Sequence, residues 1–278
     1  MDVDATAIAH AFSARAAHFL GSGTFGETWC VQGMDGTDDD FAVKVLKPEF
    51  FHAARVQREI QGLQRFEHPG IVRLFEVRTI TLGTESRTAL VCEYIEGGSV
   101  HDALKAGRLP TKKQAKKFAR GLLEAVAELH ASETIHRDIK PANIMLRDGD
   151  WAKPVLIDFG LARSLSDKTF TRYPARVGSL LWMSPEQLSA ERARKASDIW
   201  ACGVVLHSVV SGEHPFVDMA ALDQLDEDEL YDLFTVPPKP LPDSAPKSLA
   251  RLVSRFLTAE PLYSRGTAQR AVTDLKGK

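Results

Sequence analysis

Two short motifs constrain this chain more than any other feature of its sequence. The first is His136–Asn143 (HRDIKPAN), and fifteen residues after it comes Asp158–Gly160 (DFG). Asp138 can accept the proton of an attacking hydroxyl, while Asn143 and Asp158 supply the oxygen ligands that Mg²⁺ prefers. Phosphoryl transfer needs this small set of groups and little covalent chemistry from the protein. The two motifs therefore predict a fold that brings these residues together for that reaction.

Composition and charge exclude several other classes of protein. The 278 residues suffice for one large domain or two lobes, and 44% hydrophobic with 26% charged residues is ordinary for a globular protein. A formal net charge of −2 argues against a general nucleic-acid binder or a basic membrane-surface protein. Neither a signal peptide nor a membrane-spanning apolar run is visible, so we expect a cytoplasmic location. The separated Cys30, Cys92 and Cys202 favour buried apolar side chains over disulfides or a zinc site.

Apolar patterns divide the chain into a β-rich part and a helical part, with a hinge expected near residues 94–98. Strands are predicted at residues 19–32 (a strand–turn–strand hairpin), 41–46, 71–81 and 88–94. Helices are predicted at residues 53–66, 112–130 and 196–211. The Pro-rich stretch 236–246 predicts a surface loop, because proline is excluded from helix interiors and central strands.

The HRDIKPAN and DFG motifs resemble those of eukaryotic-type Ser/Thr protein kinases, and the resemblance extends from about residue 19 to about residue 270. It implies an α+β, bilobal protein-kinase-like fold, with a small β-rich N-lobe carrying one main helix and a larger, mainly helical C-lobe. We therefore expect a single protein kinase domain over 1–278, with the N-lobe at about 15–95 and the C-lobe at 96–275. The step Ser184–Gln187 (SPEQ) favours a bacterial eukaryotic-like kinase domain.

A glycine-rich segment near the start of the resembling region fits a phosphate-binding loop. Its glycines let backbone N–H groups approach phosphate oxygens. A dinucleotide fingerprint, the other interpretation, needs a helix directly afterwards, whereas residues 27–32 are strand-like. The resemblance implies ATP as the nucleotide, with Thr28 where the family has valine. The ATP-binding residues implied here are Leu20, Gly21, Ser22, Gly23, Gly26 and Thr28.

Phe41–Lys44 is similar to the V-A-I-K strand of the family, whose lysine contacts the α- and β-phosphates. The implied counter-charge for Lys44 is Glu59 on the predicted N-lobe helix, and Glu67 is a weaker rival beyond that helix. Residues 89–98 resemble the fifth strand and hinge, with Cys92 as gatekeeper or, alternatively, as a simple apolar filler. Further nucleotide-binding residues implied by the resemblance are Ala42, Lys44, Cys92, Glu93, Ile95, Ser99 and Met145.

The catalytic set implied by the resemblance consists of a base, the lysines and a pairing carboxylate. Its members are Asp138, Lys140, Lys44 and Glu59. Asn143 and Asp158 are the implied ligands of Mg²⁺, with Mn²⁺ as an alternative cation. Lys140 is typical of Ser/Thr kinases, where it neutralises the γ-phosphate. His136 is expected to be a packed core histidine, and Arg137 a cationic site for a phosphorylated activation segment.

The activation segment contains several hydroxyl groups, among which we favour Thr169 and Thr171 as autophosphorylation sites. The alternative is that both are ordinary solvated loop hydroxyls. Gly178–Glu186 is similar to the end of this segment, with Ser184 in place of the alanine of the family. Ser179 indicates Ser/Thr specificity, although Trp182 and Met183 are more like tyrosine kinases. We also expect a buried pair between Glu186 and Arg265, and backbone N–H bonds from the catalytic loop to Asp198.

The function expected from these features is an ATP- and Mg²⁺-dependent Ser/Thr protein kinase that autophosphorylates. A pseudokinase scaffold is one alternative, although such proteins usually lack the lysine, the base or a metal ligand, and all are present here. A small-molecule kinase is another, although such enzymes generally lack the step at Gly212–Phe216 (GEHPF). The expected partners are ATP, a protein substrate with Ser or Thr, and a second copy in a dimer for autophosphorylation. Neither nucleic acid nor membrane insertion is expected, and the acidic stretch 223–232 favours a solvated helix over a docking site.

Overall fold

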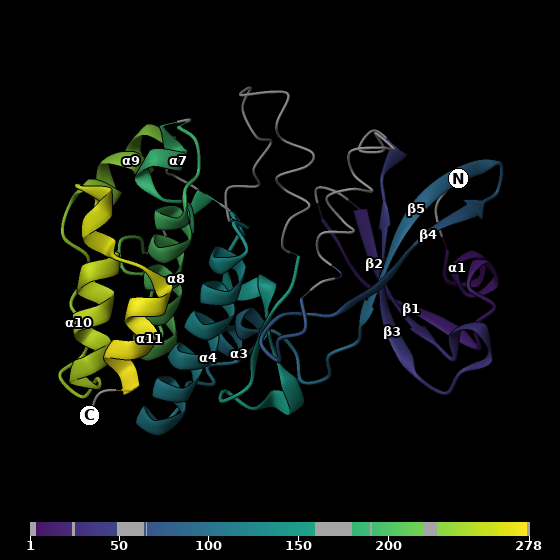
Figure 1. Cartoon of the computed structure of the whole chain (residues 1–278), viewed down its shortest axis with the longest axis horizontal. Coiled ribbons are helices and arrows are strands. Elements are labelled where there is room, and N and C mark those ends of the chain that lie inside the picture. The colour runs from purple at the N-terminus through teal and green to yellow at the C-terminus, as the bar shows by residue number, and fades with distance from the viewer. Residues whose placement is uncertain are drawn as a thin grey trace. The chain divides into compact units, whose positions relative to one another are not determined.

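The computed structural model describes residues 4–23, 26–48, 64, 66–158, 180–189, 191–218 and 227–276 (Figure 1). The chain divides into two compact units. The first unit combines Met1–His68 with Val72–Ile95, and the second combines Pro69–Ile71 with Glu96–Lys278.

The first unit contains a five-stranded antiparallel sheet in the order β1-β2-β3-β5-β4. Its strands are β1 (Ala16–Ser22), β2 (Gly26–Gln32), β3 (Asp40–Leu46), β4 (Leu74–Leu82) and β5 (Glu85–Glu93). A helix α1 (Ala5–Ala11) precedes the sheet, and the short 3-10 helix η1 (Met34–Gly36) joins β2 to β3. All the predicted strands are confirmed. However, β4 begins later than expected, because Ile71 belongs to the second unit and bridges there to Leu156.

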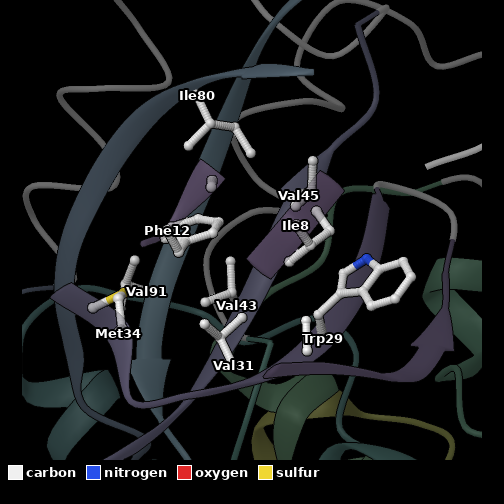
Figure 2. Close-up of a cluster of buried hydrophobic side chains, with 11 residues drawn as sticks. Ile8, Phe12, Trp29, Val31, Met34, Val43, Val45, Ile80 and Val91 are labelled. Carbon is white, nitrogen blue, oxygen red and sulfur yellow. The ribbon is translucent and has the colours of Figure 1, made fainter. Parts of the chain in front are cut away.

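One face of this sheet is covered by α1, which the sequence patterns did not predict. Ile8 and Phe12 are both fully buried and pack among apolar side chains of β1 to β5 (Figure 2). Val43 and Val45 of β3 belong to this cluster. Because successive residues of a strand point to opposite faces, Lys44 lies on the other face of the sheet. The helix and the lysine therefore occupy opposite sides of β3.

The second unit is mainly helical and also contains one short hairpin. The hairpin pairs β6 (Ile144–Leu146) with β7 (Pro154–Leu156). The two longest helices in the described part of this unit are α4 (Lys112–Ala131) and α8 (Lys195–Ser211). Its other helical elements are α3 (Val100–Lys105), η3 (Pro141–Asn143), η4 (Arg147–Gly149), α7 (Pro185–Leu188), α9 (Glu227–Thr235), α10 (Lys247–Phe256), η6 (Leu262–Arg265) and α11 (Ala268–Lys276).

Helix α8 is the central helix of this unit, since it is buried on nearly all sides and packs against both α4 and α10. A side chain at Gly203 would place its Cβ 2.8 Å from the Cβ of Phe256, so glycine permits the close contact between α8 and α10. The predicted helices 112–130 and 196–211 are confirmed within one residue at each end. Residues 236–246 contain neither helix nor strand, as predicted.

Two further predictions concern the helix expected before β4 and the burial of the three cysteines. The helix predicted over 53–66, including Glu59, lies outside the described residues except for Gln64 and Phe66. Cys30 and Cys202 are buried as expected, whereas Cys92 is half-buried. Within the described ranges, no helix has the length and apolar character that crossing a membrane requires.

Candidate active site

The loop that carries the HRDIKPAN motif is fastened to helix α8 through Asp198. The carboxylate of Asp198 accepts the backbone N–H groups of His136 and Arg137, both at 2.8 Å. It also lies 2.9 Å from Nε2 of His130, and only 1% of Asp198 is exposed. These bonds confirm the structural role predicted for Asp198. They also hold Arg137, whose φ of +71° lies in the left-handed region that side chains other than glycine rarely adopt.

His136 joins the loop to the segment that leads to the DFG motif. Its ring is fully buried, and Nε2 lies 3.1 Å from the carbonyl oxygen of Ile157. Its Nδ1 accepts the backbone N–H of Asp138 at 3.3 Å. Both ring nitrogens thus have hydrogen-bond partners within the protein. The prediction of a packed core histidine is confirmed.

The predicted base, Asp138, is oriented by two neighbouring side chains. Lys140 Nζ donates to Oδ2 of Asp138 at 2.7 Å, and Asn143 Nδ2 donates to the same oxygen at 2.8 Å. Asn143 Nδ2 also donates to the carbonyl oxygen of Asp138 at 2.9 Å. Because both side-chain bonds use Oδ2, the other carboxylate oxygen is the atom that can take a proton from a hydroxyl. The carboxylate keeps about a third of its surface exposed (34%), so a substrate can reach it.

The two predicted metal ligands are connected through backbone hydrogen bonds. Ile144, directly after Asn143, pairs with Leu156, and the N–H of Ile157 donates to the carbonyl oxygen of Asn143 at 3.0 Å. This pairing ends one residue before Asp158, which has a left-handed φ of +61°. The motif spacing therefore reflects a hairpin that returns the chain to Asn143.

The donor atoms of this pair fit magnesium. Since Nδ2 of Asn143 donates to Asp138, Oδ1 of the same amide is the atom that can ligate a cation. Together with the carboxylate of Asp158 it offers oxygen ligands only. Mg²⁺ typically takes one or two protein ligands and completes its shell with water and phosphate oxygens. Among the residues that the structure describes, no group of three or more His, Cys, Asp or Glu side chains is arranged to hold a metal ion.

In the first unit, four of the predicted nucleotide-binding residues share one face of the sheet. Lys44 lies opposite Thr28 of β2, and Ala42 lies opposite Cys92 of β5. Residues directly opposite each other on antiparallel strands point to the same face, and so do residues two apart on one strand. Lys44 is only 8% exposed. The sheet therefore gathers these side chains on the face opposite α1.

The predicted phosphate loop forms the turn between β1 and β2, with Thr24 and Phe25 outside the described residues. The N–H of Gly23 donates to the carbonyl oxygen of Gly26 at 2.8 Å. A Cβ at Gly26 would lie 2.1 Å from the carbonyl oxygen of Val45, so only glycine fits this approach of β2 to β3. Leu20, before the turn, is 49% exposed.

The structure also describes four other residues predicted to bind the nucleotide, which are Glu93, Ile95, Ser99 and Met145. The N–H of Glu93 donates to the carbonyl oxygen of Arg73, and Ile95 is buried. The hydroxyl of Ser99 donates to Asp102 at 2.6 Å and accepts the N–H of the same residue, which caps α3. Met145 pairs with Val155 in the hairpin. The predicted residues outside the described ranges are Glu59, Thr169, Thr171 and Ser179.

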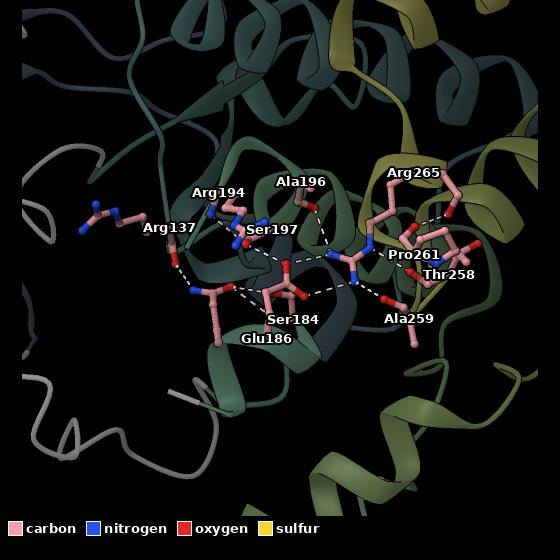
Figure 3. A network of polar contacts seen from close by, with 12 residues as sticks. Arg137, Ser184, Glu186, Arg194, Ala196, Ser197, Thr258, Ala259, Pro261 and Arg265 are labelled. Carbon is pink, nitrogen blue, oxygen red and sulfur yellow. Dashed lines mark hydrogen bonds and ion pairs between the residues drawn. The ribbon is translucent and has the colours of Figure 1, made fainter. Parts of the chain in front are cut away.

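A buried ion pair joins Glu186, at the end of the predicted activation segment, to Arg265 (Figure 3). Arg265 Nη1 donates to Glu186 Oε1 at 2.8 Å, and Nη2 donates to Oε2 at 3.1 Å. The other three guanidinium N–H groups meet carbonyl oxygens of Thr258, Ala196 and Ala259. Burial alone would raise the pKa of Glu186, but the hydrogen bonds and charge of Arg265 outweigh it, so the pKa lies below its ordinary value. The predicted pair is confirmed.

Comparison with known families agrees with this geometry. The family model of the protein kinase domain matches residues 15–275. The chain belongs to the protein kinase family. The predicted fold class is confirmed, since the kinase domain has a five-stranded antiparallel sheet followed by a helical part.

Two curated relatives illustrate the similarity of this kinase domain. Serine/threonine-protein kinase PrkC of Bacillus subtilis (strain 168) is 30% identical over 246 residues, which cover 86% of this chain and 36% of the relative. CBL-interacting protein kinase 13 of Oryza sativa subsp. japonica is 35% identical over 208 residues, which cover 72% of this chain and 39% of the relative. The chain thus spans less than two fifths of the length of each relative.

The kinase domain also contains buried polar residues whose contacts the sequence did not indicate. His214, within the GEHPF step, lies with Nε2 3.0 Å from the carbonyl oxygen of Leu181. Its Nδ1 accepts the N–H groups of Phe216 and Val217. Burial lowers the pKa of His214 to about 4. The side chain thus ties the loop after α8 to the end of the activation segment, which the motif alone did not reveal.

Proposed function

We propose that this chain is an ATP- and Mg²⁺-dependent Ser/Thr protein kinase, and that residues 1–278 form a single protein kinase domain. The carrying observation is the arrangement of Asp138, Lys140 and Asn143, in which both side chains bind one oxygen of the carboxylate. The names of both relatives support a protein kinase, and that of PrkC specifies serine and threonine. The relatives are much longer than this chain, so the proposed activity is argued from the site residues and not from the activities of the relatives.

Each proposed site residue in the helical unit has a role that follows from the chemistry of its side chain. Asp138 orients the attacking hydroxyl and accepts its proton, while Lys140 places a positive charge beside the transferred phosphoryl group. Asn143 and Asp158 would hold Mg²⁺, which neutralises charge that develops on phosphate oxygens. The 2.7 Å ion pair with Lys140 also holds the carboxylate of Asp138 in place.

The sheet of the first unit supplies the proposed nucleotide contacts. Lys44 is assigned to the α- and β-phosphates, with Glu59 as its counter-charge. The near-complete burial of Lys44 supports this role, because an ammonium is rarely buried without a function or a partner. Thr28, Ala42 and Cys92 lie on the same face and are assigned to the adenine.

Regulation by autophosphorylation belongs to the same proposal. A phosphate on Thr169 or Thr171 adds roughly −1.5 to −2 charge and three acceptor oxygens, which arginine binds well. Arg137, directly before the predicted base, is the assigned partner of that phosphate. The acceptor hydroxyl can come from a second copy of the chain in a dimer, and other protein substrates would offer Ser or Thr to the same site.

The proposal is tested by incubating the purified chain with radiolabelled ATP, Mg²⁺ and dephosphorylated casein, beside Asp138→Asn. We expect phosphoserine and phosphothreonine in the wild-type reaction, and at least a hundredfold less label, in order of magnitude, from the variant. Mass spectrometry should locate phosphate on Thr169 or Thr171. A chain that binds ATP without transferring phosphate would favour the pseudokinase scaffold. Label that reaches only small molecules would favour a small-molecule kinase.

A further inference from the structure

The backbone of Arg137, the residue before Asp138, is held on both sides by side chains from two different helices. On its N-terminal side, Asp198 of α8 accepts the N–H of Arg137 at 2.8 Å. On its C-terminal side, Gln187 of α7 donates from Nε2 to the carbonyl oxygen of Arg137 at 3.4 Å. Arg137 has a left-handed φ, and a residue persists in that conformation only where its surroundings hold it. Gln187 is one of the groups that hold it.

The side chain of Gln187 is itself oriented by Ser184. Ser184 is fully buried at the start of α7 and is labelled in Figure 3. The backbone N–H of Ser184 donates to Oε1 of Gln187 at 3.2 Å, and the hydroxyl of Ser184 donates to the same atom at 3.0 Å. Two donors on one atom identify it as the amide oxygen. The other end of the amide is therefore the NH₂ group, which faces the carbonyl of Arg137. An alanine at position 184 would lack the second of these donors.

We propose that Gln187 is a positioning residue for the base Asp138 and that Ser184 sets its orientation. This inference rests on the kinase function proposed above. The carbonyl of Arg137 belongs to the peptide bond that enters Asp138, so fixing that carbonyl fixes the direction in which Asp138 leaves the loop. Lys140 and Asn143 hold the carboxylate at its far end. Releasing the near end lets the base drift, and small misplacements of a reacting group are costly to rate.

Two substitutions distinguish the bond from Gln187 Nε2 to the Arg137 carbonyl from the bonds between Gln187 Oε1 and Ser184. Gln187→Glu has nearly the same shape and keeps an oxygen for Ser184, but it turns a second oxygen toward the carbonyl of Arg137. Gln187→Leu removes both interactions. With dephosphorylated casein as acceptor, we expect kcat to fall by about fivefold to tenfold in each variant, the loss of one hydrogen bond. The KM for ATP should stay within about twofold, since Gln187 acts on the base and not on the nucleotide.

A pH profile gives a readout that a merely structural role would not move. A glutamate held against a carbonyl oxygen has a raised pKa, and its protonated form donates a hydrogen bond again. The ratio of kcat for Gln187→Glu to wild-type kcat should therefore rise as pH is lowered from about 8 to about 6. The same ratio for Gln187→Leu should stay constant. A flat ratio for both variants would count against the inference.

Gln114 provides the matched control. At the start of α4 its Oε1 accepts the N–H and the hydroxyl of Thr111 at 3.0 and 2.8 Å, the same cap that Gln187 makes with Ser184. Gln114→Leu removes such a cap alone, so it should lower stability while leaving kcat unchanged. Wild-type kcat in both Gln187 variants, or equal loss of kcat in Gln114→Leu, would overturn the inference.

Two further outcomes are distinguishable in the same assay. If Gln187→Leu fails to fold, Gln187→Glu decides alone, because it keeps the oxygen that Ser184 binds. A folded wild-type chain without any transferase activity would overturn the proposed function, and this inference with it.

Discussion

Glu186 and Arg265 form a fully buried ion pair although 79 positions separate them in the chain. The arginine uses all five of its N–H donors, and its guanidinium also lies 4.9 Å from the ring centroid of Trp200. Such complete satisfaction offsets much of the cost of burying two charges. The pair connects helix α7 with the turn before α11, so it ties together segments that are distant in sequence.

Removing one member of this pair should strongly destabilise the fold. Arg265→Met leaves the carboxylate of Glu186 buried without its counter-charge, and we expect the free energy of unfolding to fall by about 3–5 kcal/mol. Urea denaturation measures this change. Arg270→Met is the control, because Arg270 pairs with Asp274 at the surface and its loss should cost under about 1 kcal/mol. Equal costs for the two variants would mean that the buried pair contributes no more than a surface one.

Asp158→Asn should abolish turnover while the fold persists. The substitution removes a charge from the proposed Mg²⁺ site but keeps the size of the side chain, so we expect turnover to fall by about a hundredfold or more. Phosphate transfer at saturating ATP and Mg²⁺ gives the rate, and circular dichroism checks the fold. Appreciable turnover in a folded variant would mean that Asp158 does not hold the metal.

Lys44→Met should also give a folded chain that is almost inactive. Methionine fills a similar volume in the buried position, but it cannot contact phosphate. Turnover should fall by about a hundredfold or more, and thermal unfolding should stay close to that of the wild type. Lys47→Met, on the neighbouring stretch of chain, serves as the control. Normal turnover in Lys44→Met would remove this lysine from the nucleotide site.

The buried imidazole of His214 should make stability depend on pH. Its pKa is about 4 in the folded chain against an ordinary value of 6.5, so below pH 6.5 the unfolded chain binds a proton that the folded chain refuses. Its contribution is therefore full above pH 6.5, and stability falls as pH drops from 6.5 toward 4, by at most about 3 kcal/mol. Urea denaturation across this range should show a shallower dependence for His214→Gln. Identical pH dependence in both proteins would contradict the assignment.

Phe12 should carry much of the stability of the first unit. Phe12→Ala removes a fully buried ring from the cluster under the sheet and should cost about 3–5 kcal/mol of unfolding free energy. Phe19→Ala is the comparison, because Phe19 is 55% exposed on β1, and about 1 kcal/mol or less is expected for it. Thermal or urea unfolding distinguishes the two. A neutral Phe12→Ala would mean that α1 only rests on the sheet.

The periodic placement of apolar residues predicted the strands of the five-stranded sheet and the two longest described helices, because each element buries a set of its own side chains. The 3.6-residue period of α4 and the alternation along β3 follow from which side chains each element buries. Strand β4 was placed three residues too early because Ile71 is as apolar as the strand it precedes, yet it pairs with the distant Leu156. Helix α1 has a readable start, since Asp4 accepts the N–H of Ala7, but it is too short for a periodic signal.

In the candidate site, likewise, some residues could be predicted from the sequence and others could not. Asp138, Asn143 and Asp158 stand in motifs, so their proximity could be predicted from spacing. The contact between Gln187 and Arg137 crosses 50 positions and depends on the fold of α7, so nothing in the local sequence indicated it. The role of Ser184 was likewise hidden, because a small residue replacing alanine gives no sign that its hydroxyl orients a neighbour.

Helix α1 lies before the part of the chain that the family model matches, yet it packs on the sheet. Similarity to the family starts at residue 15, whereas Ile8 and Phe12 lie before that point and cover the valines of β3. A polypeptide trimmed to the matched residues would keep each motif and still turn an apolar sheet face to water, which invites self-association. The covering of the sheet is thus an energetic criterion that places α1 with the first unit, although the family match begins only at residue 15.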